Sequence, residues 1–403
     1  MSIFSSALTR RSGKRAIFRG SLNSFKDIRK ILVIKLRHIG DVLLAVPAIR
    51  ALKKNFPDAE VSALVNSGTE EMLTLNPLLD KVMTFDRHTL KLPLAKRAAG
   101  ELGFIKRLRG EKFDMTVDLT SGDRPSLIGF LSGARYRLGY DPGKKGFRGK
   151  RLLYTHLAGA PDGSLHTVLR DIRVVEVFGI MANGLTVDIY TSTDDDSFVE
   201  ALLKGRGIEK GVPYAHIHPA SRWLFKCWTD DGMAYVIDRL ESAGIRTVLT
   251  SGPDDKEVKK VKAIVSKAKG APVDLSGRLS LKQLASLSRR ALFFFGVDTA
   301  PMHIAAASNA KVIAIFGPSG SFNWGPWDND RASSHKKTGL APYPKRNGIQ
   351  RFGKNIVLQD GRDCVPCGKD GCKGSKKSVC LDELSPVLVW DIIAKELEII
   401  QTH

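Results

Sequence analysis

Residues 293–327 read FFFGVDTAPMHIAAASNAKVIAIFGPSGSFNWGPW, and this stretch decides the fold class. The apolar run Phe293–Val297 predicts a buried strand, an Ala-rich helix follows around Pro301, and Val312–Phe316 predicts a second buried strand. Proline is tolerated in the first helical turn, because the N–H that it lacks would have no partner there. The stretch therefore predicts a compact strand, helix and strand unit.

The start of this helix is a candidate anion site. Asp298 or Thr299 is expected to cap the helix, and the free N–H groups of its first turn should point beyond the carboxyl end of the strand. A phosphate suits that place, and His303 lies one turn further along. The alternative is a well-capped core helix with a buried structural histidine, since both features are common.

Net charge is the unusual number in the composition. The chain has 63 Lys and Arg residues against 42 Asp and Glu, which gives +21. Such a charge draws a protein to polyanions, whether nucleic acid, a phosphorylated substrate or an anionic bilayer. Its Lys and Arg residues are not interleaved with aromatic residues as in a nucleic-acid-binding module, so we expect no nucleic-acid partner.

The location of the protein is predicted from what the sequence lacks. No apolar run approaches the roughly 18 residues that a membrane span needs, and the N-terminus has no continuous apolar core of a signal peptide. We therefore expect a cytoplasmic protein. Residues 10–30 are basic with scattered Phe and Ile, and we expect a disordered arm there, with a weak membrane-surface contact as the alternative.

Four of the five cysteines lie near the end of the chain, with the spacing C-x2-C-x4-C-x7-C. They are Cys364, Cys367, Cys372 and Cys380. Four thiols on a short loop raise the possibility of a zinc site, but the spacing is not that of a familiar zinc ribbon. Reduced thiols in a Gly-rich loop are the alternative, and we expect no metal in the functional site.

The first half of the chain alternates strand and helix signals. Strands are predicted at 31–35, 59–65, 81–85, 113–119 and 135–139, and helices at 42–54, 92–109, 125–131 and 166–178. Pro47 sits inside the first of these helices, so that helix should kink or begin later. Residues 140–150 form a basic, Gly-rich loop that we expect to be mobile.

A second alternation follows a weakly patterned stretch at 183–213, which predicts a domain boundary near residue 190. Its strands are predicted at 214–218, 247–250, 272–275, 293–297 and 312–316, and its helices at 230–242, 255–269, 281–290, 301–308 and 386–400. Residues 330–385 should form a polar excursion. The predicted architecture is an α/β fold with two doubly wound, Rossmann-like domains, 31–190 and 191–403, facing a central cleft after a basic arm at 1–30.

Asp41 is the candidate general base. It closes the turn LRHIGD after the first strand, where its carboxylate could take a proton from a bound hydroxyl. Lys35, Arg37 and His38 lie beside it in the sequence and would hold an anionic substrate close by. The alternative is that Asp41 only caps a helix.

Two other strand ends carry candidate groups for a diphosphate or a nucleotide. In HPASRWLFKCW, Ser221, Arg222 and Lys226 follow the strand at 214–218 and suit a diphosphate, with a solvated basic loop as the alternative. Ser251 and Gly252 form a tight turn after the next strand, where the backbone contacts of a nucleotide are usually made.

The motifs of three other enzyme classes are absent from the sequence or lie in the wrong place. The acidic pattern of metal-dependent sugar transferases matches residues 194–196 and 328–330 literally, but neither match follows a buried strand. There is no Walker A sequence and no G-x-G-x-x-G after the first strand, which argues against an NTPase or a dinucleotide dehydrogenase.

Taken together, five segments resemble the bacterial lipopolysaccharide heptosyltransferases of glycosyltransferase family 9. In order they are KLRHIGDVLLAVPAIRALKKNFPDAEVSALV, FDMTVDLTSGDRPSLIGFLSGARYRLGY, HPASRWLFKCW, DLSGRLSLKQLASLSRRALFFFGVDTAPMHIAAA and KVIAIFGPSGSFNWGPW. The resemblance runs from about residue 31 to 400. LRHIGD and the segment CVPCGKDGCKGSKKSVCL are most similar to the heptosyltransferase III subgroup.

The resemblance implies a GT-B architecture and an inverting, metal-independent transfer of heptose from ADP-L-glycero-D-manno-heptose to an inner-core heptose. Asp41 would be the general base. The implied partners are the nucleotide sugar, a phosphorylated lipid A and inner-core acceptor, and the anionic cytoplasmic face of the inner membrane, with no cofactor. The donor would be held by Ser221, Lys226, Ser251, Gly252, Ser276, Gly277, Asp298, Thr299, Ala300 and His303, and the acceptor by Lys35, Arg37, His38 and Arg124.

Two departures and two alternatives accompany this prediction. Ala300 stands where many members have Gly, which still permits a backbone N–H contact, and residues before 30 lie outside the family pattern. A transferase of the same fold could use another nucleotide sugar or acceptor. A catalytically silent ADP-binding or polyanion-binding protein is the other alternative, since fold does not fix function.

Overall fold

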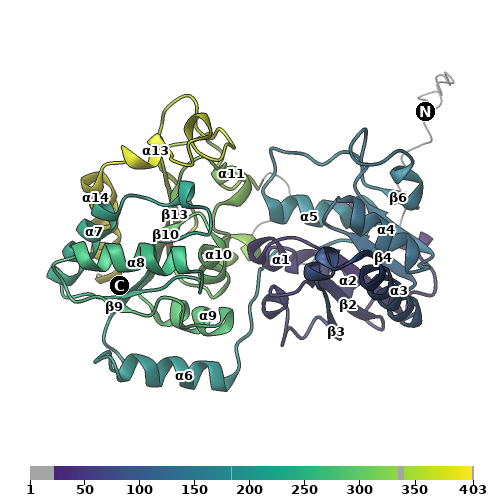
Figure 1. Cartoon of the computed structure of the whole chain (residues 1–403), viewed down its shortest axis with the longest axis horizontal. Helices are drawn as coiled ribbons and strands as arrows, with labels where there is room; N and C mark the ends of the chain where they lie inside the picture. Colours follow the sequence, from purple (N-terminus) through teal and green to yellow (C-terminus); the bar gives the residue numbers. More distant parts are fainter. Residues whose placement is uncertain (1–21, 183, 335–339, 402–403) are drawn as a thin grey trace, which may run out of the picture.

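Two α/β halves lie side by side in the computed structural model, each built on one sheet (Figure 1). The structure describes residues 22–182, 184–334 and 340–401. Residues 1–21 of the predicted arm lie outside this range. Phe25, by contrast, is buried, with its ring 5.1 Å from that of Tyr136, so the folded part begins before Ile31.

The N-terminal sheet has six parallel strands in the order β3-β2-β1-β4-β5-β6. Its central strand, KILVIK, is apolar and almost wholly buried, as a parallel strand covered on both faces should be. The strands are β1 (Lys30–Lys35), β2 (Glu60–Asn66), β3 (Lys81–Phe85), β4 (Met115–Asp118), β5 (Tyr136–Gly139) and β6 (His156–Leu157).

The C-terminal sheet repeats this plan in the order β12-β13-β11-β10-β7-β8-β9, with only the β12–β13 pair antiparallel. The sequence predicted a polar excursion at 330–385, but β13 within it is buried along its whole length. The strands are β7 (Tyr214–His218), β8 (Arg246–Leu249), β9 (Val273–Asp274), β10 (Phe293–Val297), β11 (Val312–Phe316), β12 (Gln350–Phe352) and β13 (Asn355–Gln359).

The helices cover both faces of each sheet. The predicted helix around Pro47 begins later than Val42. The chain forms a short α1, then turns, and α2 starts with Pro47 in its first turn. The helices are α1 (Ile39–Leu43), α2 (Val46–Asn55), α3 (Leu94–Gly110), α4 (Asp123–Leu131), α5 (Thr167–Glu176), α6 (Thr193–Lys204), α7 (Asp230–Ser242), α8 (Asp255–Lys267), α9 (Leu281–Arg290), α10 (Ala300–Ala307), α11 (Ser321–Trp324), α12 (Asn329–Ser334), α13 (Val379–Asp382) and α14 (Pro386–Gln401).

Apolar packing runs continuously from one half into the other. One cluster of buried residues includes Val42 and Leu43 of α1 together with Met302 and Ile304 of α10. These two helices lie side by side between the sheets (Figure 1). Both follow the carboxyl end of a central strand, β1 and β10, so the shared packing fixes those two strand ends against each other.

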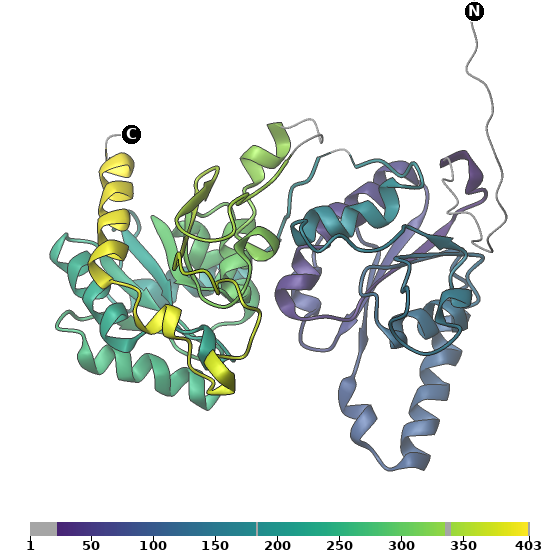
Figure 2. The same cartoon turned by 90° about the horizontal axis from the view of Figure 1, so that it is seen from above.

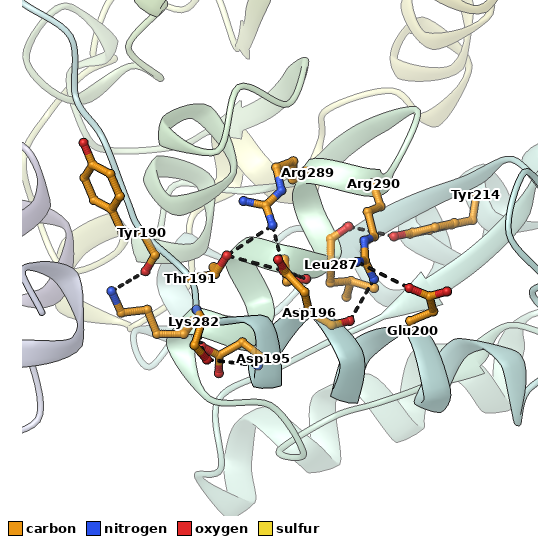
Figure 3. Close-up of polar contacts among 12 residues, drawn as sticks. Tyr190, Thr191, Asp195, Asp196, Glu200, Tyr214, Lys282, Leu287, Arg289 and Arg290 are labelled. Atoms are coloured by element: carbon orange, nitrogen blue, oxygen red, sulfur yellow. Dashed lines mark hydrogen bonds and ion pairs between the residues drawn. The ribbon is translucent and has the colours of Figure 1, made fainter. Parts of the chain in front are cut away.

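The weak stretch at 183–213 contains a helix that the sequence did not predict, α6. Ser192 and Asp195 form a capping box at its start. Asp196 accepts hydrogen bonds from Ser286 and Arg289 of α9, at 2.6 and 2.7 Å, which joins the two helices (Figure 3). The acidic run is therefore structural, and our domain boundary near residue 190 stays a proposal.

A buried lysine holds the segment before α6. The ammonium group of Lys282 donates to the carbonyl oxygen of Tyr190 at 2.5 Å (Figure 3). It also donates to the carbonyl oxygen of Thr74 at 2.7 Å. Burial lowers the pKa of this amine to about 8. One side chain of the C-terminal half thus ties down both the connecting segment and a turn of the N-terminal half.

Replacing Asp196 by Ala should destabilise the fold by about 2 kcal/mol, because Ser286 and Arg289 lose a charged hydrogen-bond acceptor. Asp194→Ala is the matched control, since Asp194 is exposed in the same helical turn. The control should lose less than about 0.5 kcal/mol through the helix dipole alone. Urea unfolding of both variants measures the difference, and equal losses would contradict the structural role of Asp196.

Candidate functional site

A cavity of about 480 Å³ lies between the two halves, where their strand ends meet. Doubly wound sheets bind ligands where the strand order reverses, beside β1 and β4 in one half and β7 and β10 in the other. The segments that follow β1, β2, β7 and β10 all line this first cavity. The predicted site residues among its walls are Arg37, His38, Asp41, Ser221, Lys226, Asp298, Thr299, Ala300 and His303.

A second cavity, of about 620 Å³, lies mainly in the N-terminal half and shares part of its wall with the first. Its walls include Lys35, Tyr140, Lys144, Lys145 and Arg170. Arg37, Asp41 and Trp324 line both cavities. A group bound in one cavity would therefore meet a group bound in the other beside the carboxylate of Asp41.

The backbone at Gly40 explains how Asp41 reaches this junction. A Cβ atom built on Gly40 would lie only 2.8 Å from the ring of His303, which belongs to the other half. A side chain there would force the His303 ring or α1 itself to shift. Glycine thus permits the close approach that sets Asp41, the next residue, against the C-terminal half.

Hydrogen bonds to two neighbouring strand ends hold the turn before Asp41. The guanidinium group of Arg37 donates to the carbonyl oxygen of Thr120, and the amide of Asn66 donates to that of Arg37, both at 2.9 Å. The backbone N–H of Leu36 donates to the hydroxyl of Thr120 at 2.9 Å. The turn is thereby pinned from β4 on one side and β2 on the other.

Lys226 and Asp298 form an ion pair of 2.7 Å across the carboxyl ends of β7 and β10. The Asp298 carboxylate is buried, whereas about a quarter of the Lys226 side chain stays accessible. Asp298 does not cap α10. Thr299 occupies the cap position without a side-chain capping bond, so the start of the helix faces the first cavity with the cation beside it.

His303 is buried one turn into α10, and its Nδ1 atom has no hydrogen-bond partner within the described ranges. Burial lowers the pKa of this imidazole to about 4, although Asp298 and Asp41 favour its charged form. It is therefore neutral near pH 7. A neutral ring beside Asp41 and Asp298 can donate or accept one hydrogen bond but adds no charge.

Lys35 differs from Lys226 although both line a cavity. It is buried and donates to Asp171 at 2.5 Å and to the carbonyl oxygen of Leu119 at 3.0 Å. Burial raises the pKa of Asp171 to about 6, an effect that Lys35 partly offsets. Two protein acceptors already hold the Lys35 ammonium group, so its position under the second cavity is fixed.

Other predicted residues lie away from the two cavities. Arg124 forms an ion pair of 2.8 Å with Glu101 and stacks over the Phe85 ring, and it lines neither cavity. At the ends of β8 and β9 the N–H of Gly277 donates to the carbonyl oxygen of Ser251 at 3.2 Å. The two turns after β8 and β9, which contain Ser251, Gly252, Ser276 and Gly277, lie together and form a shoulder beside β7.

Glu257 was not predicted, and it lies at this shoulder. Its carboxylate accepts the N–H of Gly252 at 3.3 Å. Burial raises the pKa of Glu257, and the nearby Arg222 of the first cavity partly opposes that shift. The only signal in the sequence is its place five residues beyond a strand-end glycine.

The sequence also missed part of the second cavity. Lys144 and Lys145 belong to the loop that we expected only to be mobile, yet this loop lines the cavity. Trp324 lies under the guanidinium group of Arg170 at 5.7 Å and reaches both cavities from the C-terminal half. The position of the loop directly after β5, a strand end, was the available signal.

The four clustered cysteines are free thiols, of which Cys380 is buried and Cys364 and Cys367 are exposed. Within residues 22–182, 184–334 and 340–401, no group of three or more His, Cys, Asp or Glu side chains is arranged to hold a metal ion. In the same ranges, no helix combines the length and the apolarity required to cross a membrane.

The sequence model described as glycosyltransferase family 9 (heptosyltransferase) matches residues 102–351. Lipopolysaccharide heptosyltransferase 3 of Escherichia coli K12 is 33% identical over 348 residues, which cover 82% of this chain and 94% of that protein. The chain belongs to glycosyltransferase family 9. It is therefore a glycosyltransferase, and the resemblance drawn from its motifs is confirmed.

Solved structures agree on the fold. The crystal structure of the glycosyl transferase family 9 from Veillonella parvula DSM 2008 matches with a TM-score of 0.70 at 20% identity, covering 92% of this chain and 97% of that one. The Escherichia coli heptosyltransferase WaaC with ADP matches with a TM-score of 0.66 at 19% identity, covering 91% and 99%. The predicted GT-B architecture of this family 9 enzyme is confirmed.

Replacing Gly40 by Ala should lower transferase activity at least about tenfold, because a methyl group at 2.8 Å from His303 forces the two halves apart. Gly100→Ala is the control, since a Cβ atom on Gly100 meets nothing within 4 Å. The control should keep parental activity. Turnover of both variants at saturating donor checks this, and full activity of Gly40→Ala would mean that the two helices tolerate separation.

Proposed function

We propose that this enzyme transfers heptose from ADP-L-glycero-D-manno-heptose to a heptose of the lipopolysaccharide inner core, with inversion and without a metal. The observation that carries the proposal is the position of Asp41 at the junction of two cavities, one with the groups suited to a diphosphate. Transfer of this kind needs a base on one side of the anomeric carbon and cations on the leaving group on the other.

The first cavity is the proposed donor site. The diphosphate would lie at the start of α10, where backbone N–H groups and the helix dipole favour an anion, with Lys226 as the adjacent cation. Asp298 would act as a positioning residue that holds Lys226. The adenosine would extend along the shoulder at Ser251, Gly252, Ser276 and Gly277.

Glu257 gives this shoulder a group that fits ribose. A carboxylate beyond the second strand of a doubly wound half can accept hydrogen bonds from ribose hydroxyls. Glu257 lies in the first turn of α8, after β8, the neighbour of β7, and it accepts a long bond from Gly252. We propose that it accepts the ribose hydroxyls of the donor.

The second cavity is the proposed acceptor site. Arg37, Lys144, Lys145 and Arg170 would hold a phosphorylated inner-core sugar there. Asp41 would remove the proton from the attacking hydroxyl as its oxygen bonds to the anomeric carbon from the face opposite the diphosphate. The bond from that carbon to the diphosphate oxygen breaks in the same step, and ADP leaves with the negative charge. A single displacement of this kind inverts the anomeric centre.

The acceptor lipid also implies where the enzyme works. We propose that it acts at the cytoplasmic face of the inner membrane as a peripheral protein, which suits its net charge of +21.

The proposed transfer needs no metal. Lys226 and the start of α10 would supply the charge stabilisation that a metal provides in metal-dependent sugar transferases.

Asp41→Asn should lower kcat by about 10²- to 10⁴-fold, because the amide keeps the shape of the side chain but cannot accept the proton. Asp58→Asn, at an exposed carboxylate of the same half, should match the parent. Transfer of radiolabelled heptose to a truncated inner-core acceptor is measured with and without EDTA. Loss of the parent's activity in EDTA would refute the metal-free mechanism. An Asp41→Asn variant as active as the parent would refute the role of Asp41 as the base.

Lys226→Ala should lower kcat by about 10²- to 10³-fold, because the developing charge on the leaving diphosphate loses its cation. Binding of ADP, measured by calorimetry, should weaken as well. Lys259→Ala, at an exposed lysine of α8, serves as the control and should change neither quantity. If Lys226→Ala bound ADP and turned over like the control, the diphosphate would have to lie elsewhere.

A further inference from the structure

The three large apolar side chains most exposed to solvent in the described ranges all lie between residues 94 and 152 of the N-terminal half. The three highest exposed fractions belong to Leu94 at 81%, Leu152 at 69% and Leu102 at 68%. Phe130 and Phe147 in the same part are also exposed. Single exposed leucines need no explanation, but a group of them on neighbouring elements marks an interaction surface.

Helix α3 shows that this exposure is built into the fold. Of its 17 residues, LAKRAAGELGFIKRLRG, only Phe104 and Leu108 are buried. Residues 94–100 at its start are all exposed, and this end projects from the N-terminal half, as the longer slate-blue helix at the bottom of Figure 2 shows. Leu94 and Leu102 lie eight residues apart and so on one face, with the exposed cations Lys96 and Arg97 next to Leu94. A basic helix with an exposed apolar face is typical of membrane-surface binding.

Ion pairs join α3 to α4, and α4 to the turn that carries Leu152. Glu101 of α3 pairs with Arg124 of α4 at 2.8 Å, and Asp123 of α4 pairs with Lys150 of the turn at Lys150–Leu153 at 3.1 Å. We name the surface formed by Leu94, Leu102, Phe130, Phe147 and Leu152 with the exposed cations around them the apolar–basic surface. The two ion pairs thus link α3, α4 and this turn in one part of the N-terminal half.

The charge of this part of the chain is complementary to anionic lipid. Residues 92–153 contain fourteen Lys and Arg against six Asp and Glu. A polyanion such as nucleic acid would attract the same cations, but it would gain little from exposed leucines, because single-stranded nucleic acid binds aromatic stacking platforms. Apolar side chains surrounded by cations fit the interface of a bilayer, where the former enter the acyl boundary and the latter meet lipid phosphates.

Chain segments next to this surface reach both cavities. The segment that leads to α3 starts at Arg87, a wall of the first cavity, and the loop that carries Phe147 includes Lys144 and Lys145 of the second. We propose that the apolar–basic surface docks on an anionic lipid membrane and so presents the second cavity to a lipid-linked acceptor. That the presented molecule is the acceptor rests on the function proposed above; docking itself does not.

Sedimentation with vesicles tests the docking. The full chain is mixed with vesicles of phosphatidylcholine alone and with vesicles that also contain phosphatidylglycerol. The parent should bind the anionic vesicles at least about tenfold more tightly. Leu94→Asp/Leu102→Asp and, separately, Lys96→Glu/Arg97→Glu should each weaken that binding at least about tenfold.

The matched control is Lys259→Glu/Lys262→Glu, which reverses two exposed charges on α8 of the other half. It should bind the anionic vesicles within about twofold of the parent if the surface, and not total charge, decides binding. Equal weakening by this control would overturn the proposal. So would unchanged vesicle binding of Leu94→Asp/Leu102→Asp, or duplex DNA binding that is lost with the same variants and competes with the vesicles.

A separate readout distinguishes this inference from the proposed function. Transfer to a soluble, delipidated inner-core acceptor should be parental in all four proteins, because the substituted residues line neither cavity. If the two surface variants lose vesicle binding as expected but the parent transfers no heptose, the proposed acceptor is refuted and the docking surface still stands. Parental transfer with unaltered vesicle binding in both surface variants would refute the docking alone.

Discussion

The close approach of Gly40 to His303 is the contact on which the rest of the site depends. Each residue lies just beyond the carboxyl end of a central strand, one in each half. Because Gly40 has no side chain, α1 packs directly on α10, and the buried residues of both helices form one cluster. Asp41 is thereby carried to the boundary between the two cavities, although it belongs to only one half.

Carboxylates inside the site decide how its cations can act. Lys35 and Lys226 each form an ion pair, with Asp171 and Asp298, but their surroundings differ. The side chain of Lys35 is 5% exposed and also donates to a backbone carbonyl, whereas that of Lys226 is 24% exposed. An accessible ammonium group with three donors can keep its carboxylate and still meet a ligand. Lys226 is thus preorganised for an incoming anion, and Lys35 is part of the frame beneath Asp41.

Strand ends made most of this site predictable from the sequence. Buried parallel strands appear as short apolar runs, and polar residues directly after them fall on one edge of the sheet, which is why Asp41, Lys226 and Asp298 could be placed together.

The features that the sequence prediction missed have physical reasons. Helix α6 depends on a capping box and on contacts with α9 that no local pattern reveals, and β13 looked like loop because polar residues surround its five buried ones. Arg124 carries the right charge, but Glu101, 23 residues away, holds it outside both cavities.

Net charge alone could not separate the tasks of the basic residues. Those at the strand ends line cavities, while those on α3 and around Leu152 face solvent. Total charge is the same in either case, so a count of Lys and Arg does not distinguish substrate from membrane. The exposed leucines do distinguish the two, because a phosphate gains nothing from an aliphatic side chain. A bilayer, by contrast, takes up aliphatic side chains in its acyl boundary and binds cations at its phosphates. The pairing of charge with apolar exposure, and not the size of the charge, is the basis of our proposal that the outer surface meets lipid.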